Sequence, residues 1–197
     1  MPSVDAGGTE LFYERSGSGE PLLMIQGMSA THLAWGEELL GDLRRDFETI
    51  VFDNRGMGRS GRAELPFGVP DMAADTAALM DALELESAHV LGISMGGTIA
   101  QELALAHPEK IRTLTLGATF CGGPDAVLMA PEDLQMLGAA YASGEPEQVF
   151  RAMYELNLSP GFRAEESRYA AFTKMAAELP SPRETIALQL QAIVAHD

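Results

Sequence analysis

The sequence has few cysteines and few basic residues, and each shortage excludes a class of protein. Cys121 is its only cysteine, so the chain can form no internal disulfide and no cysteine-based zinc site. Lys and Arg number 13 against 29 Asp and Glu, a formal net charge of −16. Binding to nucleic acid and docking on anionic membranes both need clustered cations. We therefore expect no nucleic-acid partner and no membrane association.

Long hydrophobic runs and a secretion signal are also missing. The apolar runs are far shorter than a membrane-spanning helix. The first eight residues, MPSVDAGG, contain no basic stretch followed by an apolar one, so a cytoplasmic location is the default expectation. Hydrophobic residues still make up 46% of the 197 residues, which is enough for one globular domain with a core.

Short apolar segments alternate with amphipathic ones over the first part of the chain. This alternation predicts an α/β fold, a mostly parallel sheet covered by helices. The segments predicted as strands are residues 9–16, 21–26, 48–53, 88–93 and 111–119, the first as a half-buried edge strand. Three segments are predicted as helices. They are residues 32–45, a second segment that begins at Asp71, which can serve as its N-cap, and residues 95–106.

The pattern changes after residue 122, where no further strand is visible. The predicted helices there are residues 131–143, 146–157, 165–178 and 183–196. We therefore predict an α/β core over residues 1–122 and an all-helical cap over residues 123–197. The Met, Tyr and Phe residues of this cap are expected mostly to pack its helices together, and some of them to line an apolar substrate pocket.

The segment Gly92-Ile93-Ser94-Met95-Gly96-Gly97 carries the strongest functional signal. It lies between a predicted buried strand and a predicted helix, the context in which G-x-S-x-G marks a nucleophile. A sharp turn there holds the serine in a strained conformation with its hydroxyl outward, and a Cβ on the flanking glycines would collide with a neighbouring element. The Met95 N–H, at the start of the helix, is suited to bind an oxyanion.

Gln26-Gly27-Met28 follows the strand predicted at residues 21–26. An acyl-transfer enzyme needs a second oxyanion donor from a loop of this kind. The Met28 N–H is the candidate donor, and Gly27 would let a substrate approach. A simple turn at the end of the strand is the alternative interpretation.

A second glycine-rich segment, Gly56 to Gly61, matches the dinucleotide fingerprint G-x-G-x-x-G. That fingerprint must open a helix whose N-terminus holds a pyrophosphate. Pro66 and Pro70 follow instead, and no helical pattern appears between them. We interpret the segment as a structural turn, with Asp53 and Arg55 holding it together.

The segments PLLMIQG, DNRGMGRS and GISMGG, in this order and spacing, resemble the α/β-hydrolase superfamily, and in particular its carboxylesterase and enol-lactonase-like branch. The resemblance covers the core, and residues 123–197 resemble the cap of that family. It implies Ser94 as the nucleophile and Met28 and Met95 as backbone oxyanion donors, with a catalytic acid and a histidine later in the chain. Gln26 stands where many members have His, which puts the subfamily in doubt more than the chemistry. Haloalkane dehalogenases and epoxide hydrolases use an Asp nucleophile, so Ser94 disfavours both.

The sequence offers no convincing acid and histidine for Ser94. We predict His32 to be a surface or capping residue, His89 an interior residue with its hydrogen bonds satisfied, and His107 the end of a helix.

Only His196 has the order that this fold requires, with Asp125 as the acid. It lies at the end of a predicted cap helix, so a Ser94–Asp125–His196 triad is the weaker hypothesis. We expect instead that the 197 residues are an N-terminal fragment or one half of a nicked chain. The acid and the histidine would then lie on a C-terminal polypeptide.

These observations predict a serine hydrolase that cleaves carboxylic esters, or lactones, through an acyl-enzyme on Ser94. Gly27, Met28 and Met95 would contact a small apolar ester-type substrate, and no metal or organic cofactor is required. The same turn also suits a C–C bond hydrolase or a cofactor-free perhydrolase. The alternative from another class is a non-catalytic ligand-binding member of the fold, or an inactive fragment.

Overall fold

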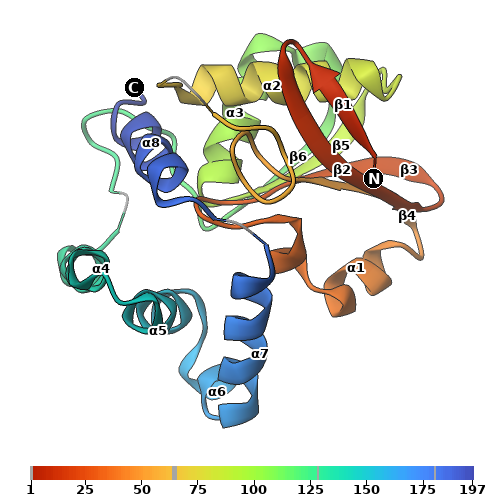
Figure 1. Cartoon of the computed structure of the whole chain (residues 1–197). Helices are drawn as coiled ribbons and strands as arrows, with labels where there is room; N and C mark the ends of the chain where they lie inside the picture. Colours follow the sequence, from red (N-terminus) through yellow and green to blue (C-terminus); the bar gives the residue numbers. More distant parts are fainter. Residues whose placement is uncertain (1, 64–65, 128, 180) are drawn as a thin grey trace. The chain divides into compact units, whose positions relative to one another are not determined.

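The computed structural model describes residues 2–63, 66–127, 129–179 and 181–197 (Figure 1). The chain folds into two compact units. The first comprises Met1–Ala126 and Pro180–Asp197, and the second comprises Val127–Leu179. The chain therefore leaves the first unit once and returns to it for its last helix.

A six-stranded sheet forms the first unit, with the strand order β1-β2-β4-β3-β5-β6. Strands β3 to β6 run parallel to one another, and β1 and β2 join antiparallel at one side. This is the predicted α/β class with a mostly parallel sheet. The strands are β1 (Ser3–Ala6), β2 (Thr9–Gly17), β3 (Glu20–Ile25), β4 (Phe47–Phe52), β5 (Ala88–Ile93) and β6 (Ile111–Gly117).

The strand predicted at residues 9–16 is present as β2, but it is not the edge of the sheet. The short strand β1 pairs with it antiparallel, from Ser3 opposite Phe12 to Ala6 opposite Thr9. Only one side chain of β1 is fully buried, so this strand has no apolar run that would reveal it in the sequence. The edge position predicted for residues 9–16 is therefore wrong, and β1 occupies it.

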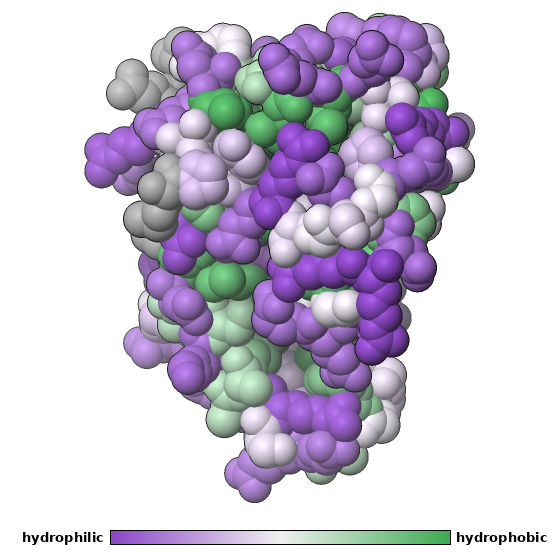
Figure 2. Space-filling model, turned by 90° about the vertical axis from the view of Figure 1, so that its right-hand side faces the viewer, coloured by the Kyte–Doolittle hydropathy of each residue, from purple (hydrophilic) through white to green (hydrophobic). Residues whose placement is uncertain are grey.

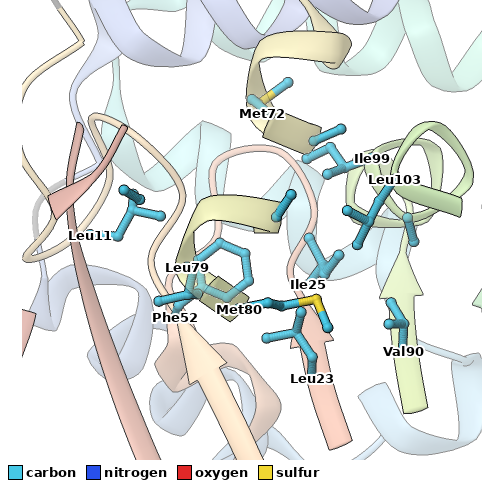
Figure 3. Packing of buried hydrophobic residues seen from close by; sticks show 14 of the residues in the cluster. Leu11, Leu23, Ile25, Phe52, Met72, Leu79, Met80, Val90, Ile99 and Leu103 are labelled. Carbon is cyan, nitrogen blue, oxygen red and sulfur yellow. The ribbon is translucent and has the colours of Figure 1, made fainter. Parts of the chain in front are cut away.

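The hydrophobic core lies between the sheet and two helices on one of its faces. Leu23 of β3 pairs with Ile50 of β4 on one side and Val90 of β5 on the other, and all three side chains are buried. Figure 3 shows Leu23, Ile25, Phe52 and Val90 beneath Met80 and other helical side chains. Apolar runs in adjacent parallel strands thus meet in register, which explains why these strands are recognisable in the sequence.

The helices of the first unit cover both faces of this sheet. Side chains of α2 and α3 pack in the cluster that contains Leu23 and Ile25. Leu40 of α1 packs instead with Leu22 and Met24, whose side chains point to the opposite face because successive residues of a strand alternate. The helices are η1 (His32–Trp35, 3-10), α1 (Glu37–Leu43), α2 (Val69–Ala82), α3 (Met95–Ala106), η2 (Pro108–Lys110, 3-10) and α8 (Arg183–Val194).

Two helix starts differ from the prediction. The helix predicted over residues 32–45 is broken at Gly36, whose φ of 71° lies in the left-handed region that suits glycine. Helix α2 begins at Val69, and Gly68 is its N-cap residue. Asp71 still caps this helix, but from its third position, where its carboxylate accepts the Gly68 N–H at 2.7 Å.

The regular elements among the described residues of the second unit are all helices, as predicted for this part of the chain. A small cluster around Leu137, Ala140 and Ala152 forms its core. Helix α6 is a single turn that the sequence pattern does not indicate. The helices are α4 (Pro131–Ser143), α5 (Pro146–Asn157), α6 (Pro160–Arg163) and α7 (Glu166–Glu178).

Helix α8 groups with the sheet unit, whereas the sequence places it in the cap of residues 123–197. Its Ala192 and Ile193 are buried in the main core cluster. The sequence pattern shows that this segment is helical and amphipathic, but not which apolar surface it covers. The compact units therefore divide at Val127 and after Leu179, and the cap boundary at residue 123 stays a prediction.

Strand β6 is the least covered strand of the parallel part of the sheet. Its residues are half-buried or exposed, and the Leu116 side chain is 42% exposed. Among the described strands, β6 pairs with β5 alone. Its outer edge therefore presents backbone groups that can pair with another strand. Hydrophilic residues cover most of the face shown in Figure 2.

Candidate active site

Ser94 forms the turn between β5 and α3, where the sequence predicts the nucleophile. Its φ of 54° and ψ of −125° are unusual for a residue with a side chain. The backbone on both sides is fixed, since the Ser94 N–H donates to Gly117 O at 2.9 Å and Thr119 Oγ1 donates to Ser94 O at 2.7 Å. The side chain is exposed and makes no hydrogen bond within the described residues.

The glycines around Ser94 are required by close packing, as expected from the motif. A Cβ on Gly92 would collide with Gly96 O, and a Cβ on Gly96 would collide with Ile25 O at the end of β3. A Cβ on Gly97 would lie 2.6 Å from the Thr119 side chain. The turn therefore fits between the neighbouring strand ends only when these three positions carry no side chain.

Gly27 lies directly against Ser94. A Cβ on Gly27 would be 3.1 Å from Ser94 Cβ and 3.5 Å from Ser94 Oγ. This proximity follows from the sheet, because β3 and β5 are parallel neighbours with Ile25 opposite Gly92. The carboxyl ends of the two strands thus bring the two predicted site segments together, as is usual for ligand sites in α/β sheets.

The predicted oxyanion donors, the Met28 and Met95 N–H groups, have no hydrogen-bond partner within the described residues. Gly27 O accepts the Ala30 N–H at 3.4 Å, which closes a four-residue turn. Because a peptide group is planar, the Met28 N–H points away from that bond. Met95 is the first residue of α3, where a backbone N–H has no partner in the helix. Their roles as oxyanion donors stay predictions, as does substrate contact by Gly27, Met28 and Met95.

Gln26 holds the backbone of the same loop. Its side chain is buried, and Oε1 accepts the Gly27 N–H at 3.1 Å. Asn54 Nδ2 donates to Gln26 O at 3.1 Å. The local hydrogen bonding expected of a glutamine at this position is therefore present.

The glycine-rich segment after β4 is the structural turn that we predicted. Asp53 is fully buried, and its Oδ2 accepts the Arg59 N–H at 2.9 Å. Ser60 Oγ donates to Asp53 O at 2.6 Å and accepts the Phe12 N–H at 2.9 Å. Arg55 instead forms an ion pair with Asp75 of α2 at 2.5 Å, so the prediction that Arg55 holds the turn together is wrong. The backbone and carboxylate of Asp53 are used in bonds within the turn, and the next described helix, α2, begins only at Val69.

His32 is buried, so the prediction of a surface or capping residue is wrong. Its Nδ1 lies 2.9 Å from Asp53 Oδ1, and its backbone N–H donates to the same oxygen at 2.8 Å. The ring also packs against Phe12, and Nε2 lies 3.5 Å from Glu14 Oε1. The sequence shows no local sign of this, because the partner carboxylate lies 21 residues further along the chain.

The described contacts of the other histidines involve groups other than the Ser94 hydroxyl. His89 Nδ1 and Nε2 contact Thr113 Oγ1 at 2.7 Å and Glu20 Oε2 at 3.0 Å, which agrees with the prediction of satisfied hydrogen bonds. His107 follows α3, with Nδ1 3.4 Å from Glu109. His196 O accepts the Gly123 N–H at 3.1 Å. Among the described residues, no hydrogen bond links Ser94 Oγ to any of these four histidines.

The shifted pKa values of the first unit lie at the amino ends of the parallel strands or on β2 and β4, rather than beside Ser94. The hydrogen bond from His89, followed by the charge of Arg112, lowers the pKa of Glu20. The hydrogen bond from Arg15 lowers the pKa of Glu48. These groups lie at the end of the sheet opposite to the turn of Ser94, and they have no part in the candidate site.

The Met and Tyr side chains of the second unit mainly pack its helices. Met136 and Met153 lie against the Leu137 cluster. Tyr154 is buried between Tyr169 and Phe172, with ring centroids 5.1 and 5.3 Å away. A hollow of about 410 Å³ between α4 and α5 is lined by Met136, by alanines and by the polar side chains of Glu147, Gln148, Arg151 and Glu155. The packing interpretation therefore holds for these side chains.

The chain is similar to several hydrolases. It is 34% identical over 152 residues to the rhodomycin D methylesterase DnrP of Streptomyces peucetius, covering 74% of this chain and 50% of that protein. It is 34% identical over 133 residues to the poly(3-hydroxyalkanoate) depolymerase of Ectopseudomonas oleovorans, covering 66% and 46%. The crystal structure of a hydrolase from Pseudomonas aeruginosa PA01 is similar with a TM-score of 0.80 and 26% identity, covering 100% of this chain and 73% of that one.

The chain thus spans about half the length of these curated relatives.

No described helix is long and apolar enough to cross a membrane. The sequence profile of the alpha/beta hydrolase fold matches residues 20–187, and this range contains the strained Ser94 turn and the parallel strands that position it. The chain belongs to the alpha/beta hydrolase family.

Proposed function

We propose that the chain supplies the nucleophile of a serine hydrolase that cleaves carboxylic esters or lactones through an acyl-enzyme on Ser94. The observation that carries this proposal is the conformation of Ser94, with φ 54° and ψ −125° and a hydroxyl that is exposed and unbonded among the described residues. Holding a serine in such a conformation costs about 1–3 kcal/mol, and strain of this size is concentrated at functional sites. Ser94 also lies against Gly27, so the loop after β3 supplies a second backbone segment beside the hydroxyl.

The reaction follows from these groups. Ser94 Oγ attacks the carbonyl carbon, the electron pair of the C=O bond moves to oxygen, and the N–H groups of Met28 and Met95 stabilise that negative charge. The start of α3 contributes its partial positive charge. The alcohol leaves with the proton that Ser94 lost, relayed by a histidine, and water then hydrolyses the acyl-enzyme.

The catalytic acid and the histidine belong, in this proposal, to a C-terminal polypeptide. His32 and His89 are bonded to other side chains, and no described histidine is bonded to Ser94. Strand β6 supports such a partner, because its outer edge is unpaired among the described strands and Leu116 is 42% exposed. A strand added there would bring new residues to the carboxyl end of the sheet, beside the turn of Ser94.

A small, apolar, uncharged ester is the substrate that we propose. The formal charge of −16 repels anions, which disfavours substrates with free carboxylates or phosphates. One relative is named a methylesterase, which supports ester cleavage. The same turn also suits C–C bond hydrolysis or perhydrolysis, and a panel of esters, lactones, carbamates and β-diketones separates these reactions.

Labelling with a fluorophosphonate, followed by peptide mapping, tests this proposal. We expect near-stoichiometric label on Ser94 in the parent chain purified together with the polypeptide that carries the histidine, and none in Ser94→Ala. The matched control is Cys121→Ala, which removes the only thiol and should label like the parent. Absence of label on Ser94 in this folded complex contradicts the proposal and favours a non-catalytic, ligand-binding member of the fold.

The variant His196→Ala locates the histidine. If it labels like the parent, the histidine lies on another polypeptide, which intact-mass analysis of the sample would detect. If it loses the label, the Ser94–Asp125–His196 arrangement is the working one, and the proposed C-terminal partner is wrong.

A further inference from the structure

Ser29, the residue after the predicted oxyanion donor Met28, is held by two side chains from the far end of the sequence. Its N–H donates to Gln189 Oε1 at 3.0 Å, and its C=O accepts a hydrogen bond from Ser181 Oγ at 3.1 Å. Gln189 lies on α8 and is fully buried. Both backbone groups of Ser29 are thus satisfied by side chains more than 150 residues away in the sequence.

These bonds act on a strained turn. Gly27 O accepts the Ala30 N–H, and Ser29, the third residue of the turn, has a φ of 63°. A positive φ at the third position is the requirement of a type II turn, where glycine is usual. For serine this conformation costs about 1–2 kcal/mol.

A type I turn would avoid that cost. The two types differ mainly in the orientation of their central peptide, which here contains Met28 C=O and Ser29 N–H. The bond to Gln189 holds the central peptide in the observed orientation, because in the alternative the Ser29 N–H would point away from Oε1.

The chemistry of Gln189 supports a role in holding the turn rather than in packing. Its Oε1 must face Ser29, since a backbone N–H needs an acceptor. Its Nε2 has no hydrogen-bond partner in the described protein, and an unpaired buried donor costs about 1–3 kcal/mol. A leucine or methionine would fill the same space without that cost, so the acceptor is what the glutamine contributes. Ala192 and Ile193 anchor the same helix in the core.

The turn controls a group of the candidate site. It begins at Gly27, which lies against Ser94, and it contains the unbonded Met28 N–H. The Gly27–Met28 peptide sets the direction of the Met28 N–H, and its oxygen accepts the Ala30 N–H. Gln189 and Ser181 bond to the two peptides between Met28 and Ala30, through the Ser29 N–H and the Ser29 C=O. We propose that Gln189 and Ser181 are positioning residues that hold this turn closed and so keep the Met28 N–H directed at the carbonyl oxygen of a substrate on Ser94. This inference rests on the function proposed above. It assigns a catalytic consequence to α8, which the sequence indicates only as a cap helix.

Two measurements test the inference, the first on the 197-residue chain and the second on its complex with the polypeptide that carries the histidine. The first is hydrogen exchange of the Ser29 amide, followed by ¹⁵N NMR, which needs no catalytic activity. The second is the kinetics of fluorophosphonate labelling at Ser94, separated into the maximal rate and the half-saturating probe concentration. The variants are Gln189→Met, which removes the acceptor, and Gln189→Glu, which keeps one. The matched control is Gln191→Met, on the exposed side of the same helix.

We expect Gln189→Met to exchange the Ser29 amide up to about tenfold faster, since one hydrogen bond is worth about 0.5–1.5 kcal/mol. Its maximal labelling rate should fall about 10- to 100-fold, somewhat less than for loss of an oxyanion donor, with the half-saturating concentration within about twofold of the parent. Gln189→Glu and Gln191→Met should behave like the parent in both measurements. If Gln189→Met does not fold, Ser181→Ala carries the test, because it removes a single hydroxyl.

The possible failures are distinguishable. If the Ser29 amide of Gln189→Met exchanges at the parent rate, Gln189 does not hold the turn, whatever the labelling shows. Faster exchange with an unchanged labelling rate overturns the positioning role. A parent complex that does not label at all contradicts the proposed function and removes the positioning role with it, while the exchange result still decides whether Gln189 holds the turn.

Discussion

Two serines of the candidate site, Ser94 and Ser29, have positive φ values, of 54° and 63°, but different parts of the molecule hold them. Ser94 is fixed by its surroundings in the sheet, namely glycines of its own turn and a backbone bond to Gly117. Ser29 is fixed by two side chains that the chain supplies only after the second unit. Steric exclusion thus shapes one turn, and hydrogen bonds across long sequence distances shape the other.

The difference determines how each turn responds to substitution. A turn held by exclusion fails when atoms are added, because the strand ends beside it cannot move apart without breaking the sheet. A turn held by hydrogen bonds fails when an acceptor is removed, and the loss is limited to the value of those bonds. We therefore expect large losses of stability from additions at the Ser94 turn and smaller, functional losses at the Ser29 turn.

The variant Gly96→Ala is expected to have the largest effect. Its methyl group would collide with Ile25 O and lie 2.7 Å from Gln26 O, and these are backbone atoms that cannot rotate away. We expect a loss of about 3 kcal/mol in the free energy of unfolding, at the upper end of overpacking effects. Denaturant unfolding followed by circular dichroism measures it.

The matched control is Gly41→Ala in α1, where an added Cβ meets nothing within 4 Å. Alanine favours helix there, so we expect a gain of up to about 1 kcal/mol. Equal stability of the two variants would show that the Ser94 turn can relax, and that exclusion does not hold it.

The Ser94 turn was predictable from the sequence for the same reason that it is intolerant of additions. Its glycines, the apolar run of β5 and the amphipathic α3 are consecutive, so one short pattern contains the whole local structure. The predicted ranges for β5 and α3, residues 88–93 and 95–106, agree with the structure. The superfamily resemblance, which depends on these segments, is confirmed by the profile match.

Most of the features that the sequence did not reveal depend on partners that are not neighbours in the chain. Gln189 was part of a predicted cap helix, and nothing near it indicates a bond to Ser29, 160 residues earlier. His32 was expected at the surface, because its partner Asp53 belongs to another turn. Strand β1 is short and mostly exposed, so only its pairing with β2 identifies it. Hydrophobic periodicity shows which face of an element is buried, but it does not show against what.

Replacing Ser94 or Ser29 by glycine tests the comparison between the two turns, because glycine relieves backbone strain without adding atoms. Strain at Ser94 costs about 1–3 kcal/mol, and the greater freedom of an unfolded glycine offsets about 0.4–1 kcal/mol. We expect Ser94→Gly to gain about 1 kcal/mol in the free energy of unfolding, and Ser29→Gly about half of that, since the left-handed region is less strained. Ser94→Ala retains the strain and should match the parent. If Ser94→Ala and Ser94→Gly are equally stable, the backbone at Ser94 is not strained.

The smallest effect concerns Glu20, at the amino end of β3, the strand that precedes the Ser29 turn. Gly27 follows the carboxyl end of β3, while Glu20 begins the strand and contacts His89 Nε2 at 3.0 Å and Arg112 Nη1 at 2.6 Å. The hydrogen bond from His89, and then the charge of Arg112, lower the pKa of Glu20. A carboxylate whose pKa is lower in the folded state stabilises the protein above its unfolded pKa, about 4.3 for glutamate, and loses that contribution as the pH falls further.

We therefore expect Glu20→Gln to be slightly less stable than the parent at neutral pH and to approach it in acid, where Glu20 of the parent is protonated. Because the Glu20 side chain is 63% exposed to solvent, salt and water screen this effect, and it should be smaller than either serine substitution. Denaturant unfolding at several pH values from about 6 to about 3 measures it. The control is Glu38→Gln, an exposed carboxylate of α1 that forms no ion pair within the described residues. A constant difference between Glu20→Gln and the parent across this range would show that the His89 and Arg112 contacts do not stabilise this end of the sheet.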